Sequence, residues 1–102
     1  MPQRDALLKL LDGPRDNALL RFAIAGECLK DGLLVEAEAH LRQALAWQAD
    51  YTAAWKLLGK VLTAAGQAAA AADAYRQGIE VATGHGDIQA RKEMTVFLRR
   101  LA

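Results

Sequence analysis

Apolar side chains recur along most of the chain at intervals of three and four residues, which is the spacing of one face of an α-helix. The spacing is clearest between residues 52 and 83, where Gly66 interrupts it. Few residues are β-branched, which argues against a β-sheet. The pattern therefore predicts an all-α chain of six helices, over residues 4–11, 17–30, 34–48, 52–65, 68–82 and 87–101.

Polar residues and glycines mark the ends of several predicted helices. The Asp-Gly-Pro sequence at residues 12–14 would end the first helix. Asp16 or Asn17 could cap the second helix by accepting hydrogen bonds from its free N–H groups. Near the C-terminus, residues 84–87 (Gly-His-Gly-Asp) predict a loop, with Asp87 as the N-cap of the last helix.

The two central helix pairs are copies of one unit. When the sequence is aligned with itself at an offset of 34 residues, Gly32 meets Gly66, and similar residues coincide on both sides of this glycine. The matches fall at helix-face spacing before and after it. A fixed period of this length is typical of helical repeat proteins, so we interpret residues 18–49 and 52–83 as two repeats.

The second repeat resembles the tetratricopeptide repeat family, whose signature is W-x2-L-G-x2-Y, a glycine and then A-x3-F. It reads Trp55-x2-Leu58-Gly59-x2-Leu62, then Gly66, then Ala71-x3-Tyr75-x2-Gly78. The first repeat follows the pattern but has Arg21 where the family has tryptophan, and Phe22 beside it could fill that space. The resemblance implies a short right-handed superhelix of antiparallel helix pairs.

The flanking segments complete the expected domain. Leucines in residues 1–16 match those of helix 34–48 at the same offset, so this segment looks like the second helix of a partial preceding repeat. Residues 87–102 lack the signature and fit a helix that caps the open end of the stack. We expect a single tetratricopeptide-like domain over residues 1–102.

Composition and charge exclude several classes of protein. The net charge of +1 gives no long-range attraction toward nucleic acid or an anionic membrane. No apolar run approaches the roughly 20 residues of a membrane span, and the first residues lack the apolar stretch of a signal peptide. Cys28 is the single cysteine, which excludes an intramolecular disulfide and a cysteine-rich metal site. We expect a cytoplasmic protein.

The sequence predicts no enzyme and no cofactor or metal site. His40 lies within a predicted helix and His85 in the glycine loop, so they do not form one polar cluster; we interpret His40 as solvated and His85 as a turn residue. Cys28 stands where the family has an aromatic residue, which favours a small buried side chain. Turnover lost in His40→Ala or His85→Ala would contradict this interpretation.

The resemblance also implies a binding surface, because in this family the first helix of each pair lines a concave groove. The candidate groove residues, on the helix faces opposite the core, are Leu19, Phe22, Leu29, Lys56, Lys60, Thr63, Lys92 and Arg99. The groove would be apolar at one end and basic at the other, which suits a peptide with an apolar side chain followed by acidic residues or a terminal carboxylate. Alternatively, the lysines form only a solvated face. Because Asn17 is the only asparagine, we expect no chaperone-type carboxylate clamp.

Two functions are consistent with these features. The leading hypothesis is a protein interaction module that binds a partner peptide or protein segment in the groove. The alternative is a structural subunit that self-associates, since leucines at positions 7, 8, 10 and 11 are more than one helix face can bury. Trp47 would pack against the next repeat or serve as an exposed anchor for a partner.

Overall fold

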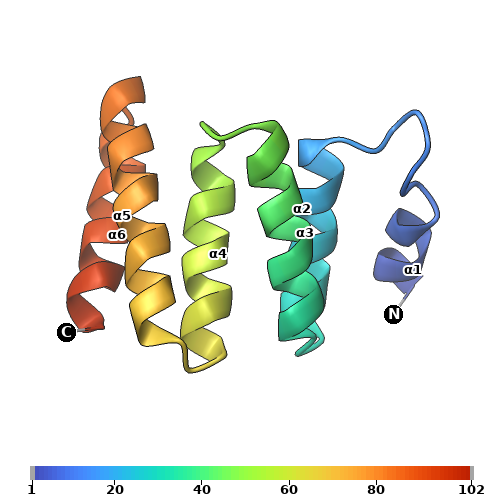
Figure 1. The fold of residues 1–102 in the computed structure, drawn as a ribbon, viewed down its shortest axis with the longest axis horizontal. Coiled ribbons are helices and arrows are strands. Elements are labelled where there is room, and N and C mark those ends of the chain that lie inside the picture. The colour runs from blue at the N-terminus through green and yellow to red at the C-terminus, as the bar shows by residue number, and fades with distance from the viewer. Residues whose placement is uncertain (1, 102) are drawn as a thin grey trace.

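The computed structural model describes residues 2–101, which form six α-helices and no strand. The helices are α1 Pro2–Leu8, α2 Ala18–Lys30, α3 Leu34–Trp47, α4 Thr52–Ala64, α5 Ala68–His85 and α6 Ile88–Arg100. They stand in a row with α1 at one end and α5 and α6 at the other (Figure 1). The predicted all-α architecture is confirmed; Met1 and Ala102, the outermost residues of the expected domain, lie outside the described residues.

Two helix ends differ from the prediction. Helix α1 ends at Leu8 because the chain then turns, with the Leu10 and Leu11 amides each donating to a carbonyl three residues earlier (3.0 and 3.2 Å). Helix α5 continues through Gly84 to His85, so the predicted loop over residues 84–87 is wrong for its first half. An exposed glycine lowers helix propensity by only about 1 kcal/mol, which the rest of this 18-residue helix offsets.

Three helices end in the same way, at glycines with a left-handed backbone. The φ angles of Gly32, Gly66 and Gly86 are 74°, 76° and 70°. After each glycine, the next amide donates back into the last helical turn: Leu33 N to Cys28 O (2.8 Å), Gln67 N to Leu62 O (2.9 Å) and Asp87 N to Ala82 O (2.8 Å). These bonds satisfy carbonyls that would otherwise lack partners, and they fix where each helix stops.

Side-chain caps begin α2 and α6. Asn17 Oδ1 accepts the Leu20 amide at 2.8 Å, and Asp87 Oδ1 accepts the Ala90 amide at 3.1 Å. Asn17 is thus the cap of α2, and Asp16 instead binds the Arg21 guanidinium. The N-cap predicted at Asp87 is confirmed.

The core of the row of helices consists of two clusters of buried side chains. Ile24, Leu41, Leu58 and Leu62 are fully buried in a cluster that joins α2, α3, α4 and the start of α5. A smaller cluster, centred on Tyr75 and Met94, attaches α6 to α5. Helices adjacent in sequence contact each other, and α2 and α6 each also touch α4. The first helices of the pairs therefore share one side of the molecule.

Glycines allow close helix crossings within this core. A methyl group at Gly59 would overlap the Tyr75 ring, and one at Gly78 would overlap the Met94 sulfur and crowd Trp55. Gly59 belongs to the repeat signature, and Gly78 follows the signature aromatic position by three residues. The lack of a side chain at these two positions therefore lets neighbouring helices approach closely.

Candidate partner-binding face

Three hollows open beside the first helices of the pairs, and together they make up what we call the groove face. One lies between α1 and α2, with a volume of about 490 Å³. The other two lie between α4 and α6: about 170 Å³ between their N-terminal halves and about 360 Å³ between their C-terminal halves. Each hollow thus borders the first helix of a pair, and α2 and α6 both touch α4.

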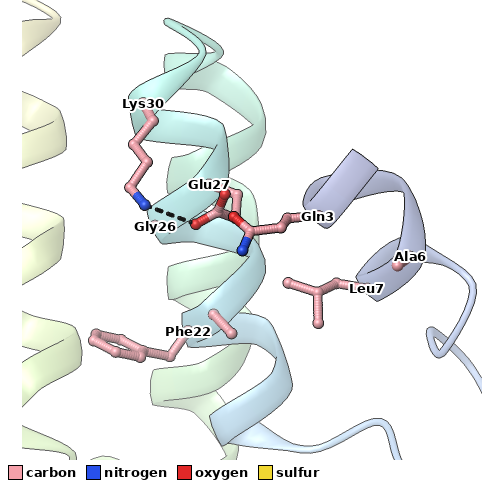
Figure 2. Close-up of a pocket in the computed structure, with 8 residues that line it drawn as sticks. Gln3, Ala6, Leu7, Phe22, Gly26, Glu27 and Lys30 are labelled. Atoms are coloured by element: carbon pink, nitrogen blue, oxygen red, sulfur yellow. Dashed lines mark hydrogen bonds and ion pairs between the residues drawn. The ribbon is translucent and has the colours of Figure 1, made fainter. Parts of the chain in front are cut away.

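The hollow between α1 and α2 is mainly apolar (Figure 2). Leu7 extends from α1 toward α2, where Gly26 lines the hollow; Phe22 also borders it, with its ring directed away from α1. An ion pair between Arg4 and Asp31 fastens α1 to the end of α2. Phe22 also packs on Tyr51, with ring centroids 5.2 Å apart, and so links this hollow to the start of α4.

The other apolar candidates are not part of that hollow. Leu19 lies at the start of α2 and is 66% exposed. Leu29 is half-buried and packs against the core cluster. Of the three apolar candidates, the structure places Phe22 in the wall of a hollow.

The hollow between the N-terminal halves of α4 and α6 contains both signs of charge. Lys56 lies 3.5 Å from Glu93, measured between Nζ and Oε1, and Asp87 lines the same hollow. The charge of Lys56 is thus balanced by α6.

The hollow between the C-terminal halves of α4 and α6, which we call the basic pocket, brings together Lys60, Thr63, Ala64, Tyr75, Phe97, Arg100 and Leu101. Lys60 Nζ lies 5.5 Å and Arg100 Cζ 5.9 Å from the centre of the Phe97 ring, within cation–π range. Thr63 Oγ1 donates to the Gly59 carbonyl of its own helix at 2.7 Å. The predicted residues Lys60 and Thr63 thus share a site with Phe97 and Arg100, which sequence reasoning missed.

The candidates on the last helix lie elsewhere. Lys92 is exposed, and Arg99 lines a separate hollow with alanines of α5 and Arg76. Helix α6 faces α4 with residues that flank its apolar side, such as Glu93 and Arg100. The predicted groove residues of this helix lie on the side opposite the core. The three-residue spacing of Phe97 and Arg100, which places them on one helix face, is the feature of the sequence that could have indicated Arg100.

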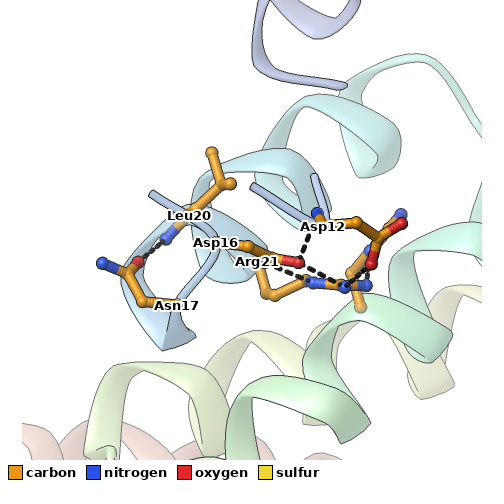
Figure 3. A network of polar contacts seen from close by, with 6 residues as sticks. Asp12, Asp16, Asn17, Leu20 and Arg21 are labelled. Carbon is orange, nitrogen blue, oxygen red and sulfur yellow. Dashed lines mark hydrogen bonds and ion pairs between the residues drawn. The ribbon is translucent and has the colours of Figure 1, made fainter. Parts of the chain in front are cut away.

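A polar cluster occupies the place of the signature tryptophan in the first repeat (Figure 3). The Arg21 guanidinium donates to both carboxylate oxygens of Asp16 at 2.9 and 2.8 Å, and to His40 Nδ1 at 3.2 Å. It also lies 5.3 Å from the centre of the Trp47 ring. In the second repeat, Trp55 stands at this position and donates its indole N–H to the Ala49 carbonyl at 2.8 Å.

The cluster explains two shifted pKa values and bears on two expectations. The hydrogen bonds from Arg21 lower the pKa of Asp16, and burial together with the nearby guanidinium lowers the pKa of His40. His40 is half-buried, so the expectation of a solvated side chain is wrong. Trp47 is 52% exposed, so of the two alternatives it is not a core side chain, and it stacks on Arg21 of its own repeat.

The remaining candidates for chemistry do not converge. Cys28 is buried as expected, and burial raises the pKa of its thiol, which disfavours the nucleophilic thiolate. His85 is the last residue of α5, with Nε2 3.6 Å from Asp50 Oδ2. Residues 2–101 contain no group of three His, Cys, Asp or Glu side chains arranged to hold a metal ion. No helix in the described part of the chain has the length and apolarity to span a membrane.

Comparisons with known proteins agree with this architecture. A sequence model of the tetratricopeptide repeat matches residues 29–92. A TPR repeat-containing protein of Pseudomonas aeruginosa is 47% identical over 97 residues, covering 95% of this chain and 92% of that protein. A solution structure from Bordetella parapertussis has a TM-score of 0.84 at 40% identity, covering 96% of this chain and 85% of that one. A tetratricopeptide repeat domain protein from Salinibacter ruber has a TM-score of 0.78 at 29% identity, covering 88% and 90%. The chain belongs to the tetratricopeptide repeat family.

Proposed function

We propose that this protein is a non-catalytic interaction module that binds a segment of a partner protein on its groove face. The tetratricopeptide repeat fold is a general scaffold for protein–protein interaction. The observation that carries the proposal is the series of hollows along α2, α4 and α6, apolar beside Phe22 and basic beside Lys60. Such a series suits a peptide with an apolar side chain at one point and an acidic or carboxylate-bearing portion at another.

The distribution of charge supports the acidic portion. Lys56 has Glu93 as a partner within the protein, whereas Lys60 and Arg100 form no ion pair with any residue in 2–101. Cations left on one side of a cleft raise the local concentration of anionic ligands. Asn17, the only asparagine, lies at the N-cap of α2 and lines none of the three hollows, so we expect no chaperone-type carboxylate clamp.

Self-association is the second candidate, and the structure weakens the observation behind it. Leu7, Leu10 and Leu11 pack against the core cluster of the same chain, and only Leu8 of the four leucines is more than a third exposed, at 37%. We therefore expect sedimentation velocity to give a monomer at all concentrations. A mass that rises with concentration would favour the assembly function.

The groove face can be blocked without weakening the fold. Gly26 lies in α2 on the wall of the hollow, and a Cβ there would meet no atom within 4 Å. Gly26→Gln would fill the hollow and raise helix propensity at the same time. Gly84, in α5, also has open space around its Cβ position and lines none of the three hollows, so Gly84→Gln is the matched control.

The test is capture of partners from native cell lysate by the wild type and both variants, with bound proteins identified by mass spectrometry. We expect at least one protein that the wild type and Gly84→Gln retain and Gly26→Gln loses. If all partners bind Gly26→Gln as well as the wild type, the hollow between α1 and α2 takes no part in binding, and the proposal of a segment that spans the groove face from Phe22 to Lys60 fails.

A further inference from the structure

We propose that the basic pocket recognises an aspartate or glutamate side chain that stands next to a bulky apolar side chain in the partner segment. The inference rests on the proposed function and deepens it, because it assigns one subsite and one ligand chemistry. Three features of the pocket carry it: the arrangement of its two cations, the lack of a counter-charge, and its apolar walls.

The two cations come from different helices and meet over one ring. Lys60 belongs to α4 and Arg100 to α6, yet both charged groups lie within 6 Å of the Phe97 centroid. Both also line one pocket, so an acidic side chain that enters it is attracted by both charges. Arginine can bind the two oxygens of a carboxylate with parallel N–H bonds, and lysine supplies a third donor.

The neighbouring hollow shows that this accumulation of positive charge is local. Along the same α4–α6 crevice, Asp87 and Glu93 line the hollow that contains Lys56. Among the described residues that line the basic pocket there is no aspartate or glutamate. An acidic ligand is therefore attracted to the C-terminal half of the crevice and repelled by the acidic residues of the N-terminal half.

The walls of the basic pocket favour an apolar side chain beside the carboxylate. Phe97 and Tyr75 pack with ring centroids 5.6 Å apart, and Ala64 and Leu101 complete an apolar lining. The volume of about 360 Å³ falls in the range of pockets that enclose small ligands. An adjacent apolar side chain could therefore enter while the acid stays at the rim.

A side-chain carboxylate fits the polar groups better than a chain terminus does. A terminal carboxylate is attached directly to the backbone, so its position is tied to that of the main chain. Thr63 already donates its hydroxyl proton to the Gly59 carbonyl, so it is not a further donor to a carboxylate held close to α4. A carboxylate on a flexible side chain needs only the two cations.

The test is a titration of isotope-labelled full-length protein, followed by NMR amide shifts, with capped peptides in a glycine–serine background. The probe peptide contains adjacent phenylalanine and glutamate. Three further peptides replace glutamate by glutamine, replace phenylalanine by alanine, or lack glutamate and end in a free phenylalanine carboxylate. We expect the probe to shift amides in residues 60–64 and 97–101, and the glutamine peptide to bind about tenfold more weakly, as expected for loss of charge-assisted hydrogen bonds.

Matched variants separate recognition from overall charge. Lys60→Gln/Arg100→Gln should weaken binding of the probe about tenfold or more. Arg42→Gln/Arg91→Gln removes the same charge from exposed positions that line none of the three hollows, and should leave affinity within about twofold.

Several results would overturn the inference. Equal binding of the glutamate and glutamine peptides, tighter binding of the free-carboxylate peptide, or no shift at millimolar peptide would each do so. Shifts confined to α2 and the start of α4, and unchanged in Lys60→Gln/Arg100→Gln, would reject this subsite while leaving the groove-face function intact. Failure of the groove-face function itself would appear as partner capture unaffected by Gly26→Gln.

Discussion

At the scale of single residues, Arg21 shows how a repeat tolerates the loss of its signature tryptophan. Its guanidinium occupies the space, donates hydrogen bonds to Asp16 and His40, and lies over the Trp47 ring. These partners come from the loop before α2 and from two turns of α3. The sequence revealed the departure at Arg21, but local patterns carry no information on which distant polar groups will meet.

The Arg21 cluster makes stability depend on pH through His40. Arg21 can only donate, so Nδ1 of His40 must be unprotonated to accept its bond. Because the pKa of His40 is below 6.5 in the folded state, protons bind more readily to the unfolded chain. The contribution of neutral His40 to stability is fully present above pH 6.5, and it is lost as the pH falls toward the pKa of His40 in the folded state. We expect the urea midpoint to fall between pH 7.5 and 5.5, and to fall less in His40→Gln.

Asp16 provides the internal check on this prediction. Its pKa is lowered from 3.8, so its contribution to stability is lost only below that pH. The window from pH 7.5 to 5.5 therefore reports His40 and not Asp16. Equal falls in wild type and His40→Gln would show that His40 does not couple folding to protons.

The same substitution at two glycines should have opposite effects. Gly59→Ala forces a methyl group into the Tyr75 ring, and overpacking of this kind costs about 1–3 kcal/mol. Gly26→Ala meets open space in a helix and should stabilise by about 0.5–1 kcal/mol. Urea unfolding followed by circular dichroism measures both. A Gly59→Ala variant as stable as the wild type would mean that Gly59 is not a packing contact, and a loss in Gly26→Ala would mean that Gly26 is.

At the scale of elements, the sequence predicted six helices and placed each end within three residues. Periodicity and caps are local, and α4, with its regular stripe and Gly66, is the clearest case. The last helix shows the limit. Its existence was predicted, but its rotation relative to α4 is determined by packing against α4 and α5, on which local patterns carry no information. That rotation brings Arg100 into the basic pocket and takes Arg99 out of it.

The cap at Asp87 should contribute measurably to α6. Its carboxylate accepts the Ala90 amide, and replacing such a cap by alanine costs about 0.5–2 kcal/mol. We expect Asp87→Ala to lower the free energy of unfolding by this amount and Asp87→Ser to restore most of it. A serine variant as unstable as the alanine variant would assign the effect to charge and not to the cap.

At the scale of the whole molecule, stability should follow the contacts between neighbouring helices. The core cluster of α2–α4 and the smaller cluster of α5 and α6 are distinct, and Met94 is fully buried in the second. Met94→Ala should cost about 2–5 kcal/mol, as for other large buried side chains. In repeat proteins each unit is stabilised mainly by its neighbours, so a local loss affects adjacent helices most. In Met94→Ala, the rate of amide hydrogen exchange should therefore rise first in α6 and at the end of α5. A uniform rise across all helices would show that the chain unfolds as one unit.

The matching turns at Gly32 and Gly66 bear on how such a chain can grow. Both glycines have nearly the same φ angle, and both turns close with the same backbone bond, 34 residues apart. A tandem duplication of the gene segment from one glycine to the next would insert a helix pair whose two junctions already exist in the protein. Lengthening the superhelix would thus require no new turn to evolve, and the added pair would be free to acquire its own ligand preference.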